Sequence, residues 1–336
     1  MAGILLSLMG LSAQNVPNGY KIVQKISLSG DGFWDYLNAD DATGMLYVSH
    51  GKMVNVVDMN TGKSVATITD VNGVHGIAID PDLKKGYISN GADSNVTVFN
   101  TKDFSVLIKV AVTGKNPDAI MYEPFTKTII TWNGRSSNAT VIDTKTDKVI
   151  QTIQLPGKPE ASVTDGKGRV YVNIEDKSEV CMINTKTWKV EQTWSISPGE
   201  GPSGLALDNT THRLFSATDK LMVILDAKTG KVITTVPTGG RVDGAAFDSG
   251  LKRAYSSCGE GVLTVVQEEN ANSFKVLGNI PTQAGARTMS VSAKTHRIYL
   301  TTSEFGPTPE KIADNQRPRP TVKPGTFTVL VVEPVK

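Results

Sequence analysis

NGVHGIAIDPDLKKGYISNGADSNVTVFNTKDFSVLIKVAVT, residues 72–113, is the stretch of sequence that decides the fold. It contains four short runs of aliphatic, β-branched and aromatic residues, separated by clusters of Gly, Pro, Asn and Asp. Runs of this composition between turn-forming residues are typical of β-strands joined by tight turns. The stretch therefore predicts four short strands in succession.

The same unit recurs along the chain at spacings of 40 to 44 residues. An acidic residue closes the first strand of six copies, and a serine takes its place in the last copy. These closing residues are Asp40, Asp80, Glu123, Asp165, Asp208, Asp248 and Ser292. A tyrosine, phenylalanine or isoleucine follows six or seven residues later in every copy. A four-stranded repeat of this length is the signature of a β-propeller blade.

Seven copies predict an all-β fold, a seven-bladed β-propeller that forms a single domain over residues 20–336. One blade cannot bury both of its faces, so neighbouring blades must pack around a central axis. The last copy supplies only three strands, ending with FTVLVVEP at 327–334, whereas YKIVQKISL at 20–28 precedes the first copy. We expect this N-terminal strand to complete the last blade, because closure removes the open ends of the array.

Composition and the N-terminus bear on compartment and partners. The hydrophobic content of 39% and net charge of +2 are ordinary for a soluble protein and favour no class of partner. Residues 1–13 have an apolar core and a small residue at Ala13, which predicts a signal peptide, although no Lys or Arg precedes the core. The alternatives are a disordered tail or a misplaced start site. Residues 14–19 would form a linker, and the exported protein would be periplasmic or secreted.

Two further sequence features limit the possibilities. Cys181 and Cys258 lie in different copies at different strand positions, so we expect two buried free thiols rather than a disulfide. The N-terminal apolar run is too short to cross a bilayer as a helix, and no other stretch approaches that length, so no membrane span is expected.

Several second strands and their turns resemble a known family. Examples are Tyr47-Val48-Ser49-His50, Tyr171-Val172-Asn173-Ile174 and Tyr299-Leu300-Thr301-Thr302, with turns such as DAKTGK at 226–231. They resemble the YVTN-repeat (YncE-like) bacterial β-propellers over residues 20–336. Members of that family are typically exported and seven-bladed, and most have no assigned catalytic activity. The resemblance thus implies a fold and a compartment.

A polar residue stands five positions before each closing residue, where the chain enters the first strand of a blade. The seven are Asp35, His75, Asp118, Glu160, Ser203, Asp243 and Arg287. First strands line the channel of a propeller, so we expect these side chains to surround one mouth of the channel. Second strands end on the same face and would add Asn90 and Asn133, with Trp34 and Trp132 as aromatic walls. The sequence therefore predicts an acidic, polar ligand-binding mouth, and it identifies no catalytic residue.

A divalent metal ion is one hypothesis for this mouth. Carboxylates in a narrow cavity raise one another's pKa values unless a cation compensates them. His50, His75, Asp35 and Asp118 are the expected ligands, and imidazole with carboxylate suits Zn, Mn, Fe or Ni. The alternative is a water-filled channel whose polar side chains bond to solvent.

The last copy carries one large insertion, SEFGPTPEKIADNQRPRPTVKPG at 303–325, between its second and third strands. Its prolines disfavour regular strand. A loop of this length is usually functional or disordered. We therefore consider both a lid or partner-binding arm over the mouth and a plain surface loop.

Three functions remain open. The first is an exported, monomeric binding protein that recognises a small molecule, peptide or protein at the mouth. The second is a metal-dependent enzyme of the lactonase or lyase type, in which His75 acts as a base or ligand and Arg287 polarises an anionic group. The third is anion binding, to DNA or polysaccharide, through basic turns such as Lys84-Lys85 and Lys252-Arg253 on the opposite face. Interleaved acidic residues weaken the case for nucleic acid.

Overall fold

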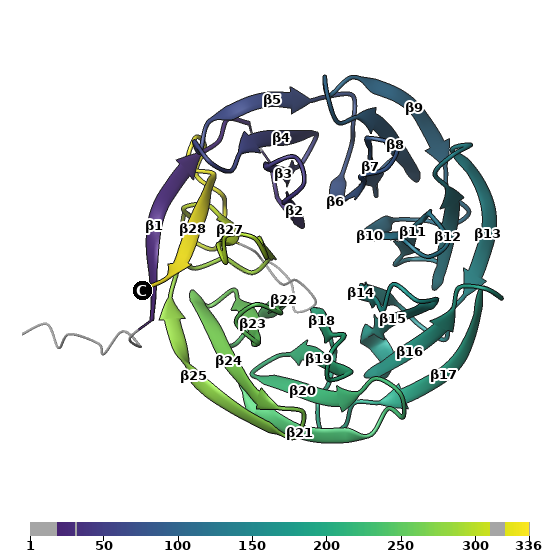
Figure 1. Cartoon of the computed structure of the whole chain (residues 1–336). Helices are drawn as coiled ribbons and strands as arrows, with labels where there is room; N and C mark the ends of the chain where they lie inside the picture. Colours follow the sequence, from purple (N-terminus) through teal and green to yellow (C-terminus); the bar gives the residue numbers. More distant parts are fainter. Residues whose placement is uncertain (1–18, 31, 310–319, 336) are drawn as a thin grey trace, which may run out of the picture.

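The computed structural model describes residues 19–30, 32–309 and 320–335. Within these residues the chain forms seven antiparallel four-stranded sheets arranged as a ring around a central axis (Figure 1). The predicted all-β, seven-bladed propeller is confirmed. No helix in this part of the chain is long and apolar enough to cross a membrane.

Each blade contains four strands that follow one another from the channel to the outer edge of the ring. Blades one to three are β2 (Leu37–Asp40), β3 (Met45–His50), β4 (Met53–Asp58), β5 (Ser64–Ile68); β6 (Val74–Asp80), β7 (Lys85–Asn90), β8 (Asn95–Asn100), β9 (Val106–Ala111); and β10 (Pro117–Glu123), β11 (Thr128–Asn133), β12 (Asn138–Asp143), β13 (Lys148–Gln154). Blades four and five are β14 (Pro159–Thr164), β15 (Arg169–Ile174), β16 (Glu179–Asn184), β17 (Lys189–Ser195), with the short 3₁₀ helix η1 (Glu175–Lys177); and β18 (Leu205–Asp208), β19 (Arg213–Thr218), β20 (Leu221–Asp226), β21 (Val232–Pro237). Blades six and seven are β22 (Val242–Asp248), β23 (Arg253–Cys258), β24 (Val262–Asn270), β25 (Ser273–Pro281); and β26 (Met289–Val291), β27 (Ile298–Thr302), β28 (Thr328–Pro334), β1 (Tyr20–Ser27).

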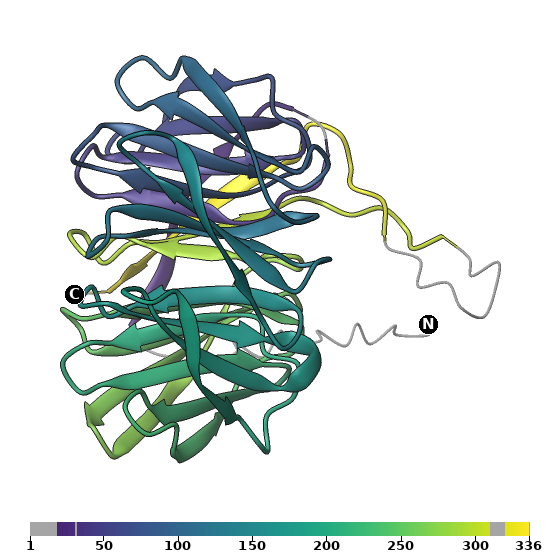
Figure 2. The same ribbon diagram turned by 90° about the vertical axis from the view of Figure 1, so that its right-hand side faces the viewer.

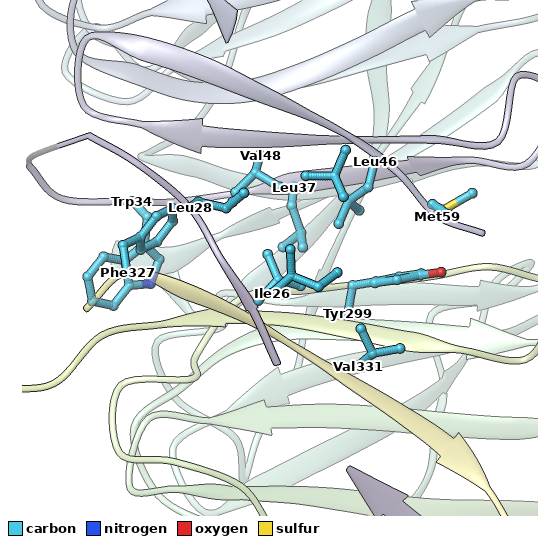
Figure 3. Packing of buried hydrophobic residues seen from close by; sticks show 12 residues of the cluster. Ile26, Leu28, Trp34, Leu37, Leu46, Val48, Met59, Tyr299, Phe327 and Val331 are labelled. Atoms are coloured by element: carbon cyan, nitrogen blue, oxygen red, sulfur yellow. The ribbon is translucent and has the colours of Figure 1, made fainter. Parts of the chain in front are cut away.

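The N-terminal strand closes the ring as expected. β1 pairs antiparallel with β28, from Tyr20 opposite Pro334 to Ser27 opposite Thr328. Ile26 of β1 and Leu28, directly after the strand, pack in the core between blades seven and one, together with Tyr299 of β27 (Figure 3). Both ends of the described chain are thereby held in one blade.

Seven apolar cores lie between neighbouring blades. Each contains one member of the repeated ring position, buried to within 2% of full burial. The seven members are Tyr47, Tyr87, Ile130, Tyr171, Phe215, Tyr255 and Tyr299. The repeat therefore marks the contacts between blades, which no single blade could form alone. Cys181 and Cys258 are free and buried, as predicted.

The closing residues recur for a physical reason. Their side-chain oxygens accept backbone N–H groups two to four positions later in the turn. Asp80 Oδ1 accepts from Asp82 (2.9 Å) and Leu83 (3.1 Å), and Asp248 Oδ1 accepts from Gly250 (2.9 Å) and Leu251 (3.2 Å). A carboxylate or hydroxyl at this position supplies the turn with acceptors that the strands cannot provide.

The closure contact can be tested at Ile26, which is 6% exposed in the core between blades seven and one. We expect Ile26→Ala to lower the free energy of unfolding by about 2–4 kcal/mol, because it leaves a cavity where two blades meet. Lys25→Ala, on the exposed side of the same strand, should change it by less than about 0.5 kcal/mol. Urea unfolding of both variants is the measurement, and equal effects would contradict this account of closure.

A buried carboxyl pair between blades five and six makes stability depend on pH. The Thr211 hydroxyl lies 2.7 Å from Asp208 Oδ2 and 2.6 Å from Glu268 Oε1, yet it has one proton to donate. Glu268 is 2% exposed. Burial raises the pKa of Glu268 to about 7, and the charge of Asp208 adds to the effect although the Thr211 bond opposes it. Glu268 is therefore protonated in the folded state at mildly acidic pH.

The pKa of Glu268 in the folded state lies above the ordinary value of 4.5, so the folded state binds this proton more tightly than the unfolded chain does. The stability gained from the bound proton is complete below pH 4.5 and is lost as pH rises through 7. We expect Glu268→Gln to remove about 2 kcal/mol of the pH dependence of unfolding between pH 5 and 8. Glu269→Gln, the exposed neighbour, should leave the dependence unchanged. Chemical denaturation at several pH values is the measurement, and an unaltered profile in Glu268→Gln would contradict the assignment.

Candidate functional site

The seven predicted mouth residues occupy equivalent places, either as the second residue of the inner strand or two positions before it. In four blades the residue lies inside a β-bulge, where the pairing between the first and second strands shifts. The four bulged residues are His75, Asp118, Glu160 and Asp243. A bulge breaks the alternation of side chains between the two faces of a sheet, and bulges often re-aim side chains at functional sites. The inner strands thereby direct polar groups to the channel mouth while the residues that follow pack in the cores.

Three of these residues form one cluster across blades one to three. His75 Nδ1 lies 2.7 Å from Asp35 Oδ2 and 3.3 Å from Asp118 Oδ1. The side chains are 26%, 16% and 15% exposed, respectively. One imidazole nitrogen is therefore shared between two carboxylates in a partly dehydrated setting.

The remaining charges extend this cluster around the mouth. Arg287 of blade seven pairs with Asp243 of blade six, lies 3.7 Å from Asp35 Oδ1 and donates to the carbonyl oxygen of Trp34 at 2.9 Å. In blade four, Lys158 Nζ lies 2.6 Å from Glu160 Oε1 and also pairs with Glu175 at the end of the second strand. Ser203 is not part of this charge network, because its hydroxyl donates to the carbonyl oxygen of Val242 at 3.0 Å.

The cluster shifts the pKa values of its members. Burial raises the pKa of Asp118 to about 6, assisted by the charge of Asp35. Burial and the charge of Asp118 likewise raise the pKa of Glu160 to about 7, against the effect of Lys158. Burial lowers the pKa of His75, but the bond to Asp35 and the charges of Asp118, Asp35 and Glu160 outweigh it, so this pKa is raised. The mouth thus stabilises positive charge.

Below the charged residues lies a cavity of about 180 Å³. In five blades the small residue that follows the mouth residue lines it, namely Gly76, Ala119, Ala161, Gly204 and Gly244. Blade one carries Tyr36 at this position instead, and Tyr36 both lines the cavity and packs against the core between blades three and four. Burial and the charges of Glu160, Asp35 and Asp118 raise the pKa of Tyr36 well above its ordinary value. The phenol therefore stays protonated beside these carboxylates.

The predicted aromatic walls lie inside the cores. Trp132 is fully buried, and its indole N–H donates to the Ser162 hydroxyl at 2.7 Å. Trp34 is 5% exposed and packs against Phe327, with ring centroids 5.3 Å apart. Neither ring forms a wall of the mouth, because both are held between blades.

The second-strand residues are also set back from the mouth. Asn90 and Asn133 are fully buried, and each donates to an asparagine and a threonine of the next strand. His50 is 1% exposed, with its ring stacked on Phe327 at a centroid distance of 3.9 Å. Among the described residues, the group of close metal-ligating atoms contains Asp35, His75 and Asp118, without His50. His50, the fourth metal ligand that the sequence predicts, is therefore not a member of this group.

Two residues of the site were missed by the sequence analysis. Lys158 stands two positions before Glu160, and Tyr36 directly follows Asp35. The available signal was Tyr36 itself, the one large ring at a position where five other copies carry Gly or Ala. Lys158 offered no comparable signal, because lysines are common in the loops of this chain.

The described parts of the insertion, residues 303–309 and 320–325, leave the ring on the mouth side. Its described arms pair through a bridge between Phe305 and Val322 and an ion pair of 3.2 Å between Glu304 and Lys323. Figure 2 shows these yellow arms extending from the side of the ring opposite to the C-terminal end. Phe305 also contacts Trp34, with ring centroids 6.0 Å apart. Residues 310–319, on which the lid hypothesis depends, lie outside the described part of the chain.

Comparison with known proteins supports the fold. No protein-family model and no curated protein sequence matches the chain. A solved structure of Kuenenia stuttgartiensis hydrazine synthase matches with a TM-score of 0.70 and 16% identity, covering 81% of this chain and 94% of that chain. The structure of U3-55K matches with a TM-score of 0.76 and 8% identity, covering 94% and 98%. At these identities the similarity establishes the fold alone: the chain is a seven-bladed β-propeller.

The ion pair between Arg287 and Asp243 can be measured directly. Both side chains are partly withdrawn from solvent, at 38% and 21% exposure, so we expect a coupling energy of about 1 kcal/mol from a double-mutant cycle with Arg287→Gln and Asp243→Asn. The exposed pair Lys323–Glu304, at 54% and 60%, should give less than about 0.5 kcal/mol in the matching cycle. Urea unfolding supplies both values. Equal coupling in the two cycles would show that the mouth does not strengthen its ion pairs.

Proposed function

We propose that this protein is an exported binding protein that holds a positively charged ligand at the acidic mouth of its channel. The observation that carries this proposal is the imbalance of charge there. The carboxylates are Asp35, Asp118, Glu160, Glu175 and Asp243. Besides His75, the side chains of Lys158 and Arg287 are the cations paired with them in the described structure. A partly dehydrated site with excess negative charge favours a cation as its ligand.

The parts of this proposal that concern export and family membership are based on the sequence. The predicted signal peptide at 1–13 lies outside the described residues, as does most of the linker at 14–19. The resemblance of the repeat to the YVTN-repeat propellers supports a periplasmic or secreted protein. A small molecule, a peptide or a side chain of a protein partner could each supply the positive charge.

Spermidine is a suitable first probe, because it is cationic and slender enough to enter a narrow mouth. We expect it to raise the melting temperature of the full chain by about 2–4 °C at saturation, whereas citrate should not. A variant with Glu160→Gln and Asp243→Asn should lose at least half of the shift. Differential scanning fluorimetry is the measurement.

The control is Asp82→Asn, which removes a carboxylate from the opposite face, where Asp82 pairs with Lys127 at 3.0 Å. It should keep the full shift with spermidine. An absent shift, or one of equal size in the mouth variant, would overturn binding of an organic cation at the mouth.

A metal-dependent lactonase or lyase is the second candidate function. The cluster of Asp35, His75 and Asp118 favours it, since these residues offer a set of metal ligands. Arg287 supports it less, because its guanidinium is already bound to Asp243 and to the carbonyl oxygen of Trp34. An anionic substrate would have to displace these partners before Arg287 could polarise it. Binding therefore remains the function that the site supports better.

Anion binding through the turn face is supported least. Basic residues of this face pair with carboxylates of the same or a neighbouring blade. The pairs include Lys85–Asp147 at 2.6 Å, Lys127–Asp82 at 3.0 Å, Arg213–Asp226 at 2.8 Å and Arg297–Glu333 at 2.5 Å. Nucleic acid or polysaccharide would compete with these internal partners.

A further inference from the structure

We infer that Asp35, His75 and Asp118 form a binding site for one divalent transition-metal ion at the mouth of the channel. This inference rests on the proposed function, because it names the cation that the acidic mouth holds. It commits to three protein ligands: one imidazole nitrogen and one oxygen from each carboxylate.

The spacing of the three ligand atoms suits an ion. Two ligand atoms that each lie about 2.1 Å from a metal are about 3.0 Å apart at a right angle and about 3.4 Å apart at the tetrahedral angle. The observed separations from His75 Nδ1 are 2.7 Å to Asp35 Oδ2 and 3.3 Å to Asp118 Oδ1. All three atoms lie within 4.8 Å of one another. Small side-chain rotations are therefore enough to admit an ion, and the open side of the mouth leaves coordination positions for water or a ligand.

The second oxygen of each carboxylate faces a separate neighbour, a cation for Asp35 and a hydrogen-bond donor for Asp118. Asp35 Oδ1 lies 3.7 Å from Arg287 Nη1, and Asp118 Oδ2 accepts a hydrogen bond from Asn116 Nδ2 at 3.3 Å. The facing oxygens, Asp35 Oδ2 and Asp118 Oδ1, are the ones directed at His75. Outer partners that orient the ligands in this way are typical of metal sites in proteins.

The imidazole is positioned by a glycine. A Cβ atom at Gly91 would lie 2.6 Å from His75 Nε2, closer than atoms can approach without movement. Because Gly91 has no side chain, the imidazole ring of His75 packs against it, with Nδ1 facing the two carboxylates. The backbone holds the same arrangement, because the Tyr36 N–H donates to the carbonyl oxygen of His75 at 3.1 Å and the Ser89 hydroxyl donates to that of Asp118 at 2.5 Å.

The donor set selects the class of metal. One imidazole with two carboxylates suits Zn²⁺, Mn²⁺, Fe²⁺ or Co²⁺, whereas Ca²⁺ and Mg²⁺ prefer oxygen ligands alone. Both cysteines are buried, Cys181 in the core between blades three and four, so neither contributes a thiolate to this site. Zn²⁺ and Co²⁺ are therefore the probes, with Ca²⁺ as the contrast.

A proton can in principle take the place of the metal. A His75 imidazolium with its Nδ1–H between the two carboxylates would satisfy the same short distances without an ion. The two arrangements differ in what they bind, so metal titration separates them.

The experiment uses the full chain, stripped of metal by dialysis against a chelator and then freed of the chelator. Isothermal titration calorimetry with Zn²⁺ should show one ion per chain, bound at least 100-fold more tightly than Ca²⁺. Co²⁺ should give visible absorption bands that Zn²⁺ removes. At a hundred-fold excess over its Kd, Zn²⁺ should raise the melting temperature by about 4 °C.

Three variants assign the site. His75→Ala and Asp118→Asn should each weaken Zn²⁺ binding at least 100-fold, and Gly91→Ala should weaken it about 10-fold because it displaces the ring while keeping all three ligands. His212→Ala, which removes a histidine on the opposite face, should bind as tightly as the parent chain. Melting of the metal-free variants confirms that each is folded, and Asp118→Asn alone decides the matter if His75→Ala does not fold.

The outcomes separate this inference from the proposed function. No stoichiometric metal together with spermidine binding would overturn the metal site and leave the proposed function standing. Zn²⁺ binding that survives in His75→Ala and Asp118→Asn would also overturn it. Failure of both cations would overturn both proposals, and an NMR signal for a protonated His75 Nδ1 that persists in excess Zn²⁺ would identify the proton as the cation.

Discussion

The pairing of β1 with β28 is the contact on which the rest of the ring depends. Each apolar core lies between two blades, so a blade that lacks its outer strand weakens the cores on both of its sides. β1 adds Tyr20 to the core between blades six and seven and Ile26 to the core between blades seven and one, where Leu28, directly after the strand, also packs. One strand from the start of the chain therefore completes two cores, and closure fixes how far apart the inner strands stand around the channel.

This constraint also creates the site. Asp35 and Arg287 are distant in sequence, yet closure places blade seven beside blade one, where Arg287 reaches both Asp35 and the backbone of Trp34. The same junction holds Trp34 between Phe305 and Phe327. The aromatic packing at the rim thus positions the carboxylate that follows it in the chain. Stability of the closure and geometry of the mouth are two effects of one set of contacts.

The repeat made the fold and the mouth predictable, because equivalent positions in the sequence become equivalent places around the axis. Counting from the closing residues therefore located His75 and its two carboxylate neighbours. The sequence placed the aromatic walls and His50 at the mouth, and these placements differ from the structure for another reason. Side chains alternate along a strand, so Trp132 shares the face of Ile130, and His50 shares that of Val48, both in cores between blades. The bulges that free His75 and Asp118 from this alternation left no distinct mark in the sequence.

The geometry at His75 shows what the mouth requires. Two carboxylates face one nitrogen, while the outer oxygen of Asp118 accepts a hydrogen bond from Asn116 and that of Asp35 faces Arg287, so the space between them is suited to positive charge. A proton and a metal ion both meet that requirement, but they make different demands on the surroundings. A proton needs only the two short contacts, whereas a metal also needs oriented outer oxygens and an open side. The contacts of Asn116 and Arg287 orient the outer oxygens, and the packing of the imidazole ring against Gly91 orients His75. The mouth provides the open side. The metal therefore accounts for more of the structure than the proton does.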